Sequence, residues 1–317
     1  MDTACFAVDW GTTSFRLWAL RRDGAAAAVE RRGEGMAALA PGDYASTLER
    51  ALTALSGGKA ADPDIPVVVC GMAGAAQGWR NAPYLPLPAT FADIAANAVV
   101  APRIERDVRI LPGLAQMTAA APDVMRGEET LLLGADLSDG MVCLPGTHAK
   151  WVSLDQGRVV AFRTAMTGEV FDLLAERSTL SHYASCERTA EASFADSPAF
   201  EAGVLDGFAA GGDLLAAAFS VRAGPLLFGE AAAAGARARL SGLLIGAEIA
   251  ALAPRRPATP ICLVASGELA RIYARALRIA GLPATAIDAE AAARRGLARC
   301  AAEIWSARFQ ATNGGSA

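Results

Sequence analysis

The sequence predicts an α/β protein of two domains that share one plan. The chain has 317 residues, which exceeds the usual size of a single hydrophobic core. Hydrophobic residues make up 53% of it, as in a well-buried enzyme, although alanine, which buries little area, inflates that share. The third observation is a supersecondary unit that recurs once, about 135 residues after its first appearance, as in a duplicated fold.

The first copy of this unit opens the chain. Apolar runs at 4–8, 15–20 and 27–29 are separated by a Gly-Thr-Thr-Ser turn at 11–14 and by Asp-Gly at 23–24. Short apolar runs between glycine and aspartate turns predict antiparallel strands.

The second copy begins near residue 140. Apolar runs at 141–144, 151–154 and 159–162 are separated by Pro-Gly-Thr-His-Ala at 145–149 and by Asp-Gln-Gly at 155–157. The order matches the first copy: strand, Gly-Thr loop, strand, turn, strand. This recurrence is the strongest structural indication in the sequence.

The remaining elements follow from periodicity and turn residues. We place the domain boundary near residue 112, giving domains 1–112 and 113–317, and expect the last helix to pack back on the first domain. The tail after that helix is expected to be disordered. The expected helices are 44–55, 240–251, 268–280 and 289–307, and the expected further strands are 67–70, 110–111 and 261–265.

Composition excludes several classes of function. The net charge is -4 with no cluster of Lys and Arg, which argues against a nucleic-acid partner. Because the first residues resemble a strand, we expect no signal peptide. The longest apolar stretch, 240–253, is too short to span a bilayer. The 6 cysteines show no CxxC spacing, so we expect reduced core thiols and a cytoplasmic protein. A homodimer stays open.

The first Gly-Thr loop has the residues of a phosphate site. Asp9, at a strand end, is suited to hold Mg²⁺ because hard cations prefer oxygen ligands. Gly11, Thr12, Thr13 and Ser14 offer backbone N–H groups and hydroxyls to phosphate oxygens. An ordinary hairpin loop is the alternative.

The second loop strengthens the phosphate interpretation. Gly146, Thr147 and His148 occupy the equivalent place in the second copy. In a duplicated fold, the two loops are expected to face each other across a cleft and to hold the triphosphate of ATP from both sides. Lys150 is either a phosphate contact or a solvated strand residue, and His148 is alternatively a residue that shapes the turn.

A family resemblance rests on these loops and on further motifs. The chain resembles the superfamily of sugar kinases, acetate kinase, hexokinase and actin, and more narrowly the 2-dehydro-3-deoxygalactonokinase family. The resemblance implies an actin-like ATPase (ribonuclease H-like) fold with a duplicated mixed-sheet core. The motifs are Val-Asp-Trp-Gly-Thr-Thr (8–13), Gly-Met-Ala-Gly (71–74), Gln-Gly-Trp (77–79), Ala-Pro-Tyr (82–84), Met-Arg-Gly-Glu-Glu-Thr (125–130), Leu-Pro-Gly-Thr-His (144–148), Lys-Trp (150–151), Met-Thr-Gly-Glu (166–169) and Leu-Ser-Gly-Leu-Leu-Ile-Gly (240–246).

The resemblance implies transfer of the ATP γ-phosphate to the 6-hydroxyl of 2-dehydro-3-deoxy-D-galactonate. Related kinases place an aspartate base at a helix start in a Gly-Asp context, and the matching stretch here is Gly127-Glu128-Glu129. Glu128 is therefore the expected base, with Glu129 and Asp123 as competitors. A carboxylate at a helix N-terminus is also a plain capping choice.

The sugar-acid site is expected at the glycine-rich turn that begins at Gly71 and opens a helix. Gln77, Trp79 and Tyr84 are expected to contact the substrate, and Thr167 to border the site together with Thr164 and Glu169. The candidates for its carboxylate are Arg16 and Arg80. Alternatively, the glycines allow close packing and Trp79 belongs to the core.

Ser266 and Gly267 lie at the strand-to-helix turn where the superfamily places its adenosine loop; a simple helix N-cap at Ser266 is the alternative. Two other functions remain. One is a kinase for another sugar acid, such as 2-dehydro-3-deoxygluconate. The other is a non-catalytic actin-like ATPase interaction protein, which shares the fold.

Overall fold

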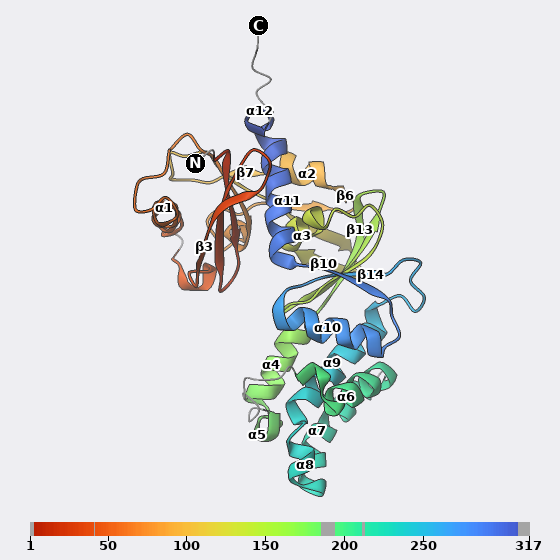
Figure 1. Ribbon diagram of the computed structural model, residues 1–317. Coiled ribbons are helices and arrows are strands. Elements are labelled where there is room, and N and C mark those ends of the chain that lie inside the picture. Colours follow the sequence, from red (N-terminus) through yellow and green to blue (C-terminus); the bar gives the residue numbers. More distant parts are fainter. Residues whose placement is uncertain (1–2, 41, 185–193, 211–212, 310–317) are drawn as a thin grey trace. The chain divides into compact units, whose positions relative to one another are not determined.

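A computed structural model describes residues 3–40, 42–184, 194–210 and 213–309 (Figure 1). The chain divides into two compact units. The first comprises 1–138, 155–161 and 289–317, and the second comprises 139–154 and 162–288. The expected boundary at residue 112 lies inside the first unit, and the final helix belongs to that unit as well.

The central sheet of the first unit has the strand order β3-β2-β1-β4-β8-β7. Strands β1, β2 and β3 form an antiparallel meander, whereas β1, β4 and β8 run parallel. The parallel strands are buried along almost their whole length because helices cover them, as their continuous apolar runs require. The bounds are β1 Cys5–Trp10, β2 Phe15–Leu20, β3 Ala26–Arg32, β4 Val67–Gly71, β7 Val99–Val100 and β8 Val108–Ile110.

Helix α1 (Tyr44–Leu55) closes one side of the first unit's core. Trp10 is the centre of an aromatic cluster there, 4.8 Å from Phe15 and 4.9 Å from Tyr44 between ring centroids. Such edge-on and tilted contacts add to the stabilisation from buried area. The cluster fixes the end of β1, which carries Asp9.

Helix α11 (Ala289–Ile304) packs against α3 (Glu128–Ala135), as Figure 1 shows. The two backbones approach so closely that a Cβ on Gly134 would lie 1.8 Å from the Ala292 carbonyl oxygen, and one on Gly296 would lie 1.9 Å from that of Thr130. Only glycine permits this approach. The contact holds the first turn of α3 in place.

A three-stranded sheet of order β10-β9-β5 completes the first unit and was not foreseen from the sequence. It explains why residues after 112 stay with this unit, because β9 pairs with β5 of the expected first domain. The bounds are β5 Tyr84–Pro86, β9 Gly113–Thr118 and β10 Ala121–Met125, with β6 Ala89–Thr90 and α2 Phe91–Ala96 nearby in sequence.

A second sheet, most of whose residues lie in the second unit, repeats the plan, with β15-β14-β11-β12-β13 as consecutive neighbours. Strands β11 and β12 are antiparallel, and β11, β14 and β15 are parallel. Two sheets with the same strand order and directions confirm the predicted duplicated, actin-like fold class. The bounds are β11 Gly140–Leu144, β12 Ala149–Asp155, β13 Arg158–Ala165, β14 Ile261–Val264 and β15 Ala284–Ile287.

Helices form the rest of the second unit. Glycines at 203 and 207 in α6 face glycines at 242 and 246 in α9, where each added Cβ would lie within 2.4 Å of a backbone carbonyl oxygen. The helices are α4 Thr167–Arg177, α5 Ser181–Ala184, α6 Pro198–Ala210, α7 Leu214–Phe228, α8 Glu230–Ala233, α9 Ala236–Leu252 and α10 Gly267–Ile279; the short α12, Ser306–Phe309, follows α11 in the first unit.

Most expected elements are confirmed within one to four residues. The prediction that a helix begins after Gly71 is wrong. The chain there forms one 3₁₀ turn, Met72–Gly74, which is followed by further turns. The chain turns there because Gly78 packs onto the carbonyl oxygens of Met72 and Ala73. The expected disordered tail lies outside the described residues.

Five cysteines are free and buried within the described residues, as predicted, while Cys186 lies outside them. Among the described helices, none combines the length and the apolar character that a bilayer crossing needs.

Candidate active site

In the first unit, the ends of β1 and β4 and the start of α3 meet. Parallel pairing sets Asp9 beside Cys70, and the Cys70 thiol donates to Asp9 Oδ1 over 3.8 Å. A Cβ on Gly127 would lie 3.4 Å from the Gly71 Cα, so α3 begins against the end of β4. Carboxylates from two distant segments, Asp9 and Glu128, therefore share one neighbourhood.

Asp9 is a partly buried carboxylate held by Arg16. The two residues are cross-strand partners, and Arg16 Nη1 donates to Asp9 Oδ2 over 3.0 Å. Burial raises the pKa of Asp9, Arg16 opposes that rise, and the charge of Glu128 adds to it. Arg16 thus faces Asp9, although strand alternation alone left its direction open.

The first Gly-Thr loop is a tight, externally braced hairpin. Gly11 N donates to Ser14 O over 2.8 Å, and the carbonyl oxygens of Gly11 and Thr12 accept from the N–H groups of Met36 and Ala37. The side chains of Thr12 and Thr13 are exposed. Within the described ranges, the N–H groups of these two threonines donate to no protein acceptor. The loop therefore offers donors at a fixed position.

Two glutamates begin α3, and they differ in accessibility. Arg126 N donates to Glu128 Oε2 over 3.0 Å, and Gly127 N donates to Glu129 Oε2 over 2.6 Å. Glu129 is fully buried, whereas Glu128 is partly exposed. Burial, reinforced by the charge of Glu128, raises the pKa of Glu129 to about 8. Only Glu128 combines a helix-start position with access to a ligand.

Asp123 lies on β10, and its Oδ1 accepts from Val124 N over 2.8 Å. This strand leads directly into α3, so the third candidate base belongs to the same unit as the other two.

The predicted substrate residues in the turn after Gly71 differ in their exposure to solvent. Gly71 adopts φ +85°, which favours glycine. Gln77 and Arg80 are exposed, but Trp79 is 8% exposed, stacks on Tyr44 at 5.9 Å and donates from its indole N–H to Pro102 O over 3.1 Å. The structure thus places Trp79 in the core.

Tyr84 is 42% exposed at the start of β5, and the guanidinium of Arg126 lies 4.3 Å from its ring centroid. Arg126 was not singled out from the sequence. Its place in the motif at 125–130 was the only available signal.

In the second unit, the second Gly-Thr loop packs on the start of α4. Glu169 N donates to Thr147 O over 3.0 Å, and His148 Nε2 lies 2.6 Å from Glu169 Oε2. A Cβ on Gly168 would lie 2.6 Å from the Gly146 carbonyl oxygen. The helix N-terminus and the loop therefore form one local structure.

Lys150 lies beneath this loop. It is 5% exposed, and its ammonium donates to His148 O over 3.0 Å. The interpretation as a solvated strand residue is wrong, because its side chain turns back under the loop that precedes it.

A small apolar cavity of about 110 Å³ adjoins the same loop. Beneath it, the buried Glu248 carboxylate accepts from Trp151 Nε1 over 2.8 Å and from the Tyr273 hydroxyl over 2.9 Å. Burial raises the pKa of Glu248, and hydrogen bonds from Thr167, Trp151 and Tyr273 oppose that rise. The cavity is lined by Gly146, Thr167, Gly168, Phe171, Ser241, Leu244, Ile245, Leu269, Ile272 and Tyr273.

Ser266 and Gly267 are exposed at the start of α10, the helix that also supplies Leu269 and Ile272 to the cavity. Ser266 Oγ donates to Asp288 Oδ2 over 2.6 Å and makes no side-chain cap. The N-cap alternative is therefore wrong for its hydroxyl.

Comparisons with known proteins decide the family. The family model described as 2-keto-3-deoxy-galactonokinase matches residues 9–300. The chain belongs to this kinase family. It is 48% identical over 315 residues to the probable 2-dehydro-3-deoxygalactonokinase DgoK1 of Rhizobium meliloti (strain 1021), covering 96% of this chain and 99% of that protein.

Two further relatives agree. The 2-dehydro-3-deoxygalactonokinase of Escherichia coli (strain K12) is 33% identical over 301 residues, covering 94% of this chain and 97% of that protein. The crystal structure of a protein from Sinorhizobium meliloti, described in its own name as a putative 2-dehydro-3-deoxygalactonokinase, superposes with a TM-score of 0.87 at 48% identity. It covers 95% of this chain and 99% of its own. These comparisons confirm the prediction that the chain is a carbohydrate kinase of the 2-keto-3-deoxy-galactonokinase family.

For a kinase of this family, the donor set of the first unit fits a magnesium ion that arrives with a nucleotide. No group of three His, Cys, Asp or Glu side chains suited to hold a metal occurs in the described part of the chain. Mg²⁺ usually takes one or two carboxylates, waters and substrate phosphates rather than a protein cage. Asp9 satisfies that lesser requirement.

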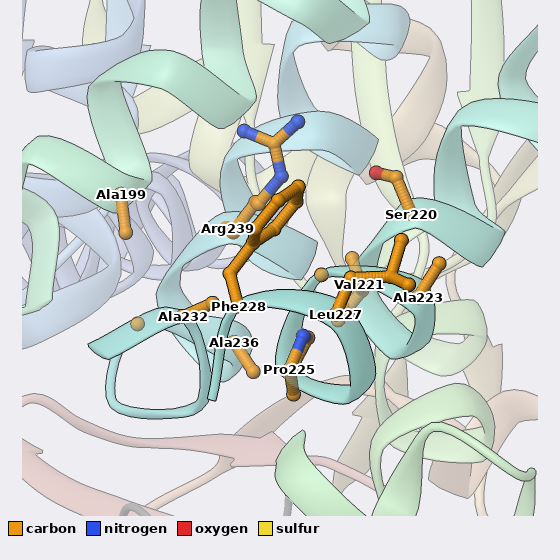
Figure 2. A pocket seen from close by; sticks show the side chains of 12 residues that line it. Ala199, Ser220, Val221, Ala223, Pro225, Leu227, Phe228, Ala232, Ala236 and Arg239 are labelled. Carbon is orange, nitrogen blue, oxygen red and sulfur yellow. The ribbon is translucent and has the colours of Figure 1, made fainter. Parts of the chain in front are cut away.

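Figure 2 shows a larger hollow, of about 420 Å³, in the second unit of this family member. Leu227, Phe228 and Arg239 line it, and Arg239 is paired with Asp206. It contains none of the residues predicted to bind substrate or nucleotide, so it is a separate feature of the surface.

Proposed function

We propose that the protein transfers the γ-phosphate of ATP to the 6-hydroxyl of 2-dehydro-3-deoxy-D-galactonate, as a step in galactonate catabolism. The observation that carries the proposal is Glu128, a partly exposed carboxylate at the start of α3 that interacts electrostatically with Asp9. Family membership supplies the acceptor, because both curated relatives carry that activity in their names.

In the proposed reaction, Glu128 accepts the proton of the 6-hydroxyl while the hydroxyl oxygen forms a bond to the γ-phosphorus. The bond from that phosphorus to the bridging oxygen breaks, and ADP leaves with the electron pair. Glu129 does not compete for the proton near neutral pH, because it already carries its own. Asp123 remains the alternative base.

Asp9 and the first loop are proposed to bind the phosphates of ATP and to balance their negative charge. Asp9 would hold Mg²⁺, which neutralises charge on the β- and γ-phosphate oxygens when bound. Arg16 keeps the Asp9 carboxylate oriented. Gly11, Thr12, Thr13 and Ser14 would donate to phosphate oxygens through backbone N–H groups and hydroxyls.

The second loop is proposed to bind the other part of the nucleotide. Gly146, Thr147 and His148 would contact phosphate, and Lys150 would support them through its bond to His148 O. The adjoining apolar cavity would take the adenine, with Thr167 at its border and Ser266 and Gly267 at the start of α10. An apolar hollow with a few polar groups suits a purine base.

The sugar acid is proposed to bind at the turn after Gly71, with Gln77 and Tyr84 as contacts. Trp79 is proposed to support this turn from the core rather than to cover a sugar face. The free, buried cysteines support a reducing compartment and hence the cytoplasm.

Coupled ADP release with Mg·ATP tests the proposal. We compare 2-dehydro-3-deoxy-D-galactonate, its gluconate epimer and no acceptor. Turnover that depends on the galactonate compound is expected. Faster turnover of the gluconate epimer would favour a kinase whose substrate is 2-dehydro-3-deoxygluconate. ADP release that neither acid changes would favour a non-catalytic actin-like ATPase interaction protein.

A further inference from the structure

Arg126 has two guanidinium nitrogens that the described part of the chain leaves without an acceptor. Its Nη2 donates to Ala82 O over 2.9 Å, and its guanidinium stacks on Tyr84. Nε and Nη1 are buried without any hydrogen-bond partner, and Nη1 lies 2.7 Å from where a Cβ on Gly74 would be. No ion pair to Arg126 occurs within the described residues.

An arrangement of this kind is unfavourable without a ligand. A guanidinium stays protonated at any physiological pH, so it cannot relieve burial by losing its charge. Buried charges in proteins are paired or bind an ion, because an unpaired one retains the full cost of desolvation. The missing partner is therefore expected to be an anion that the substrate-free chain lacks.

We propose that Arg126 binds the carboxylate of the sugar-acid substrate, with the exposed ring of Tyr84 beside it. This inference rests on the proposed function, because a sugar acid supplies the anion. Both unsatisfied donors, Nε and Nη1, are covered by protein atoms. The Arg126 side chain therefore has to turn away from Gly74 to bind the carboxylate. The residue immediately precedes Gly127 and Glu128, so a bound carboxylate is held in the same unit as the proposed base.

Arg126 fits this role better than the two arginines suggested by the sequence. Arg16 already pairs with Asp9 over 3.0 Å. Arg80 is exposed, so water solvates its charge and no ligand is needed to compensate it. Two buried nitrogens without a hydrogen-bond partner distinguish Arg126 from both.

Glu129 is the rival partner within the chain. Its Oε1 is also buried without a hydrogen bond, and the charge of Arg126 acts on it through space. A merely structural Arg126–Glu129 pair predicts that replacing either residue changes stability alike and leaves substrate choice unchanged. Substrate choice is therefore the decisive measurement.

The test compares kcat/KM for the sugar acid and for its neutral C1 carboxamide. The wild type is expected to prefer the carboxylate on the order of 10- to 100-fold, as for a hydrogen-bonded charge. Arg126→Met is expected to abolish that preference, to leave the KM for ATP unchanged, and to melt no lower than the wild type because an uncompensated charge is gone. Arg126→Lys, which keeps the charge, is expected to restore part of the preference.

Arg80→Met tests the competing assignment and is expected to keep the full preference. A preference retained by Arg126→Met, or lost in Arg80→Met, overturns the inference. The inference is also overturned if Glu129→Gln loses as much of the preference for the carboxylate as Arg126→Met does. If Arg126→Met does not fold, the lysine variant decides, because an unchanged preference there contradicts the need for a guanidinium. A wild type that turns over neither compound contradicts the proposed function instead.

Discussion

Glu128 and Glu129 are adjacent at the start of α3, yet one is open to ligand and the other is fully buried. Each accepts a backbone N–H from the residue two positions before it. The packing of α11 on α3 creates the difference, because it covers the face that carries Glu129. Burial accordingly raises the pKa of Glu129 to about 8.

Glu128→Gln is expected to lower kcat on the order of 10²- to 10⁴-fold, because the amide cannot accept the hydroxyl proton. The KM for ATP should change little, since the amide oxygen can still accept from Arg126 N. Steady-state kinetics with both substrates check this. Glu129→Gln is the matched variant and should retain most turnover; a collapse there instead would make Glu129 the base.

Glu129 is expected to make stability depend on pH. Its pKa rises from an ordinary 4.5 to about 8 in the folded protein. Between those values the folded chain keeps a proton that the unfolded chain has lost, so the free energy of unfolding falls as pH rises through that window. At pH 8 the burial penalty is on the order of a few kcal/mol.

Urea unfolding of wild type and Glu129→Gln between pH 5 and 8 measures this dependence. The variant has no carboxyl to ionise, so its stability relative to wild type should increase with pH. Parallel profiles for the two proteins would contradict a raised pKa at this position.

Gly168→Ala is expected to weaken ATP binding. The added Cβ would lie 2.6 Å from the Gly146 carbonyl oxygen and 2.8 Å from the Thr147 Cα, so the second loop must shift. We expect the KM for ATP to rise on the order of 10-fold, since small misplacements at such a site are costly. Gly224→Ala is the control, because its nearest neighbour would be 3.9 Å away.

Glu248→Ala is expected to destabilise the second unit by about 2–4 kcal/mol. It leaves the Trp151 indole N–H and the Tyr273 hydroxyl buried without their acceptor. Thermal and urea unfolding measure the loss. Tyr273→Phe, which removes one hydrogen bond and leaves the carboxylate, should cost about 1 kcal/mol; equal losses would argue against a shared network.

By itself, the sequence determined the duplicated plan and its two Gly-Thr hairpins. These features depend on local chemistry: apolar alternation sets strands, and glycine, aspartate and threonine set the turns between them. The helix at Tyr44–Leu55 and the position of Glu128 at a helix start were predictable for the same reason.

Only the tertiary structure decided which polar and aromatic side chains are buried. Trp79 stacks on Tyr44 from another segment, and Lys150 turns beneath its own loop. Glu129 and two nitrogens of Arg126 are buried, although the residues between them, Gly127 and Glu128, are only half-buried. Burial is a property of what packs on a residue, and in this chain residues up to 270 positions apart are in contact, beyond what local periodicity can specify.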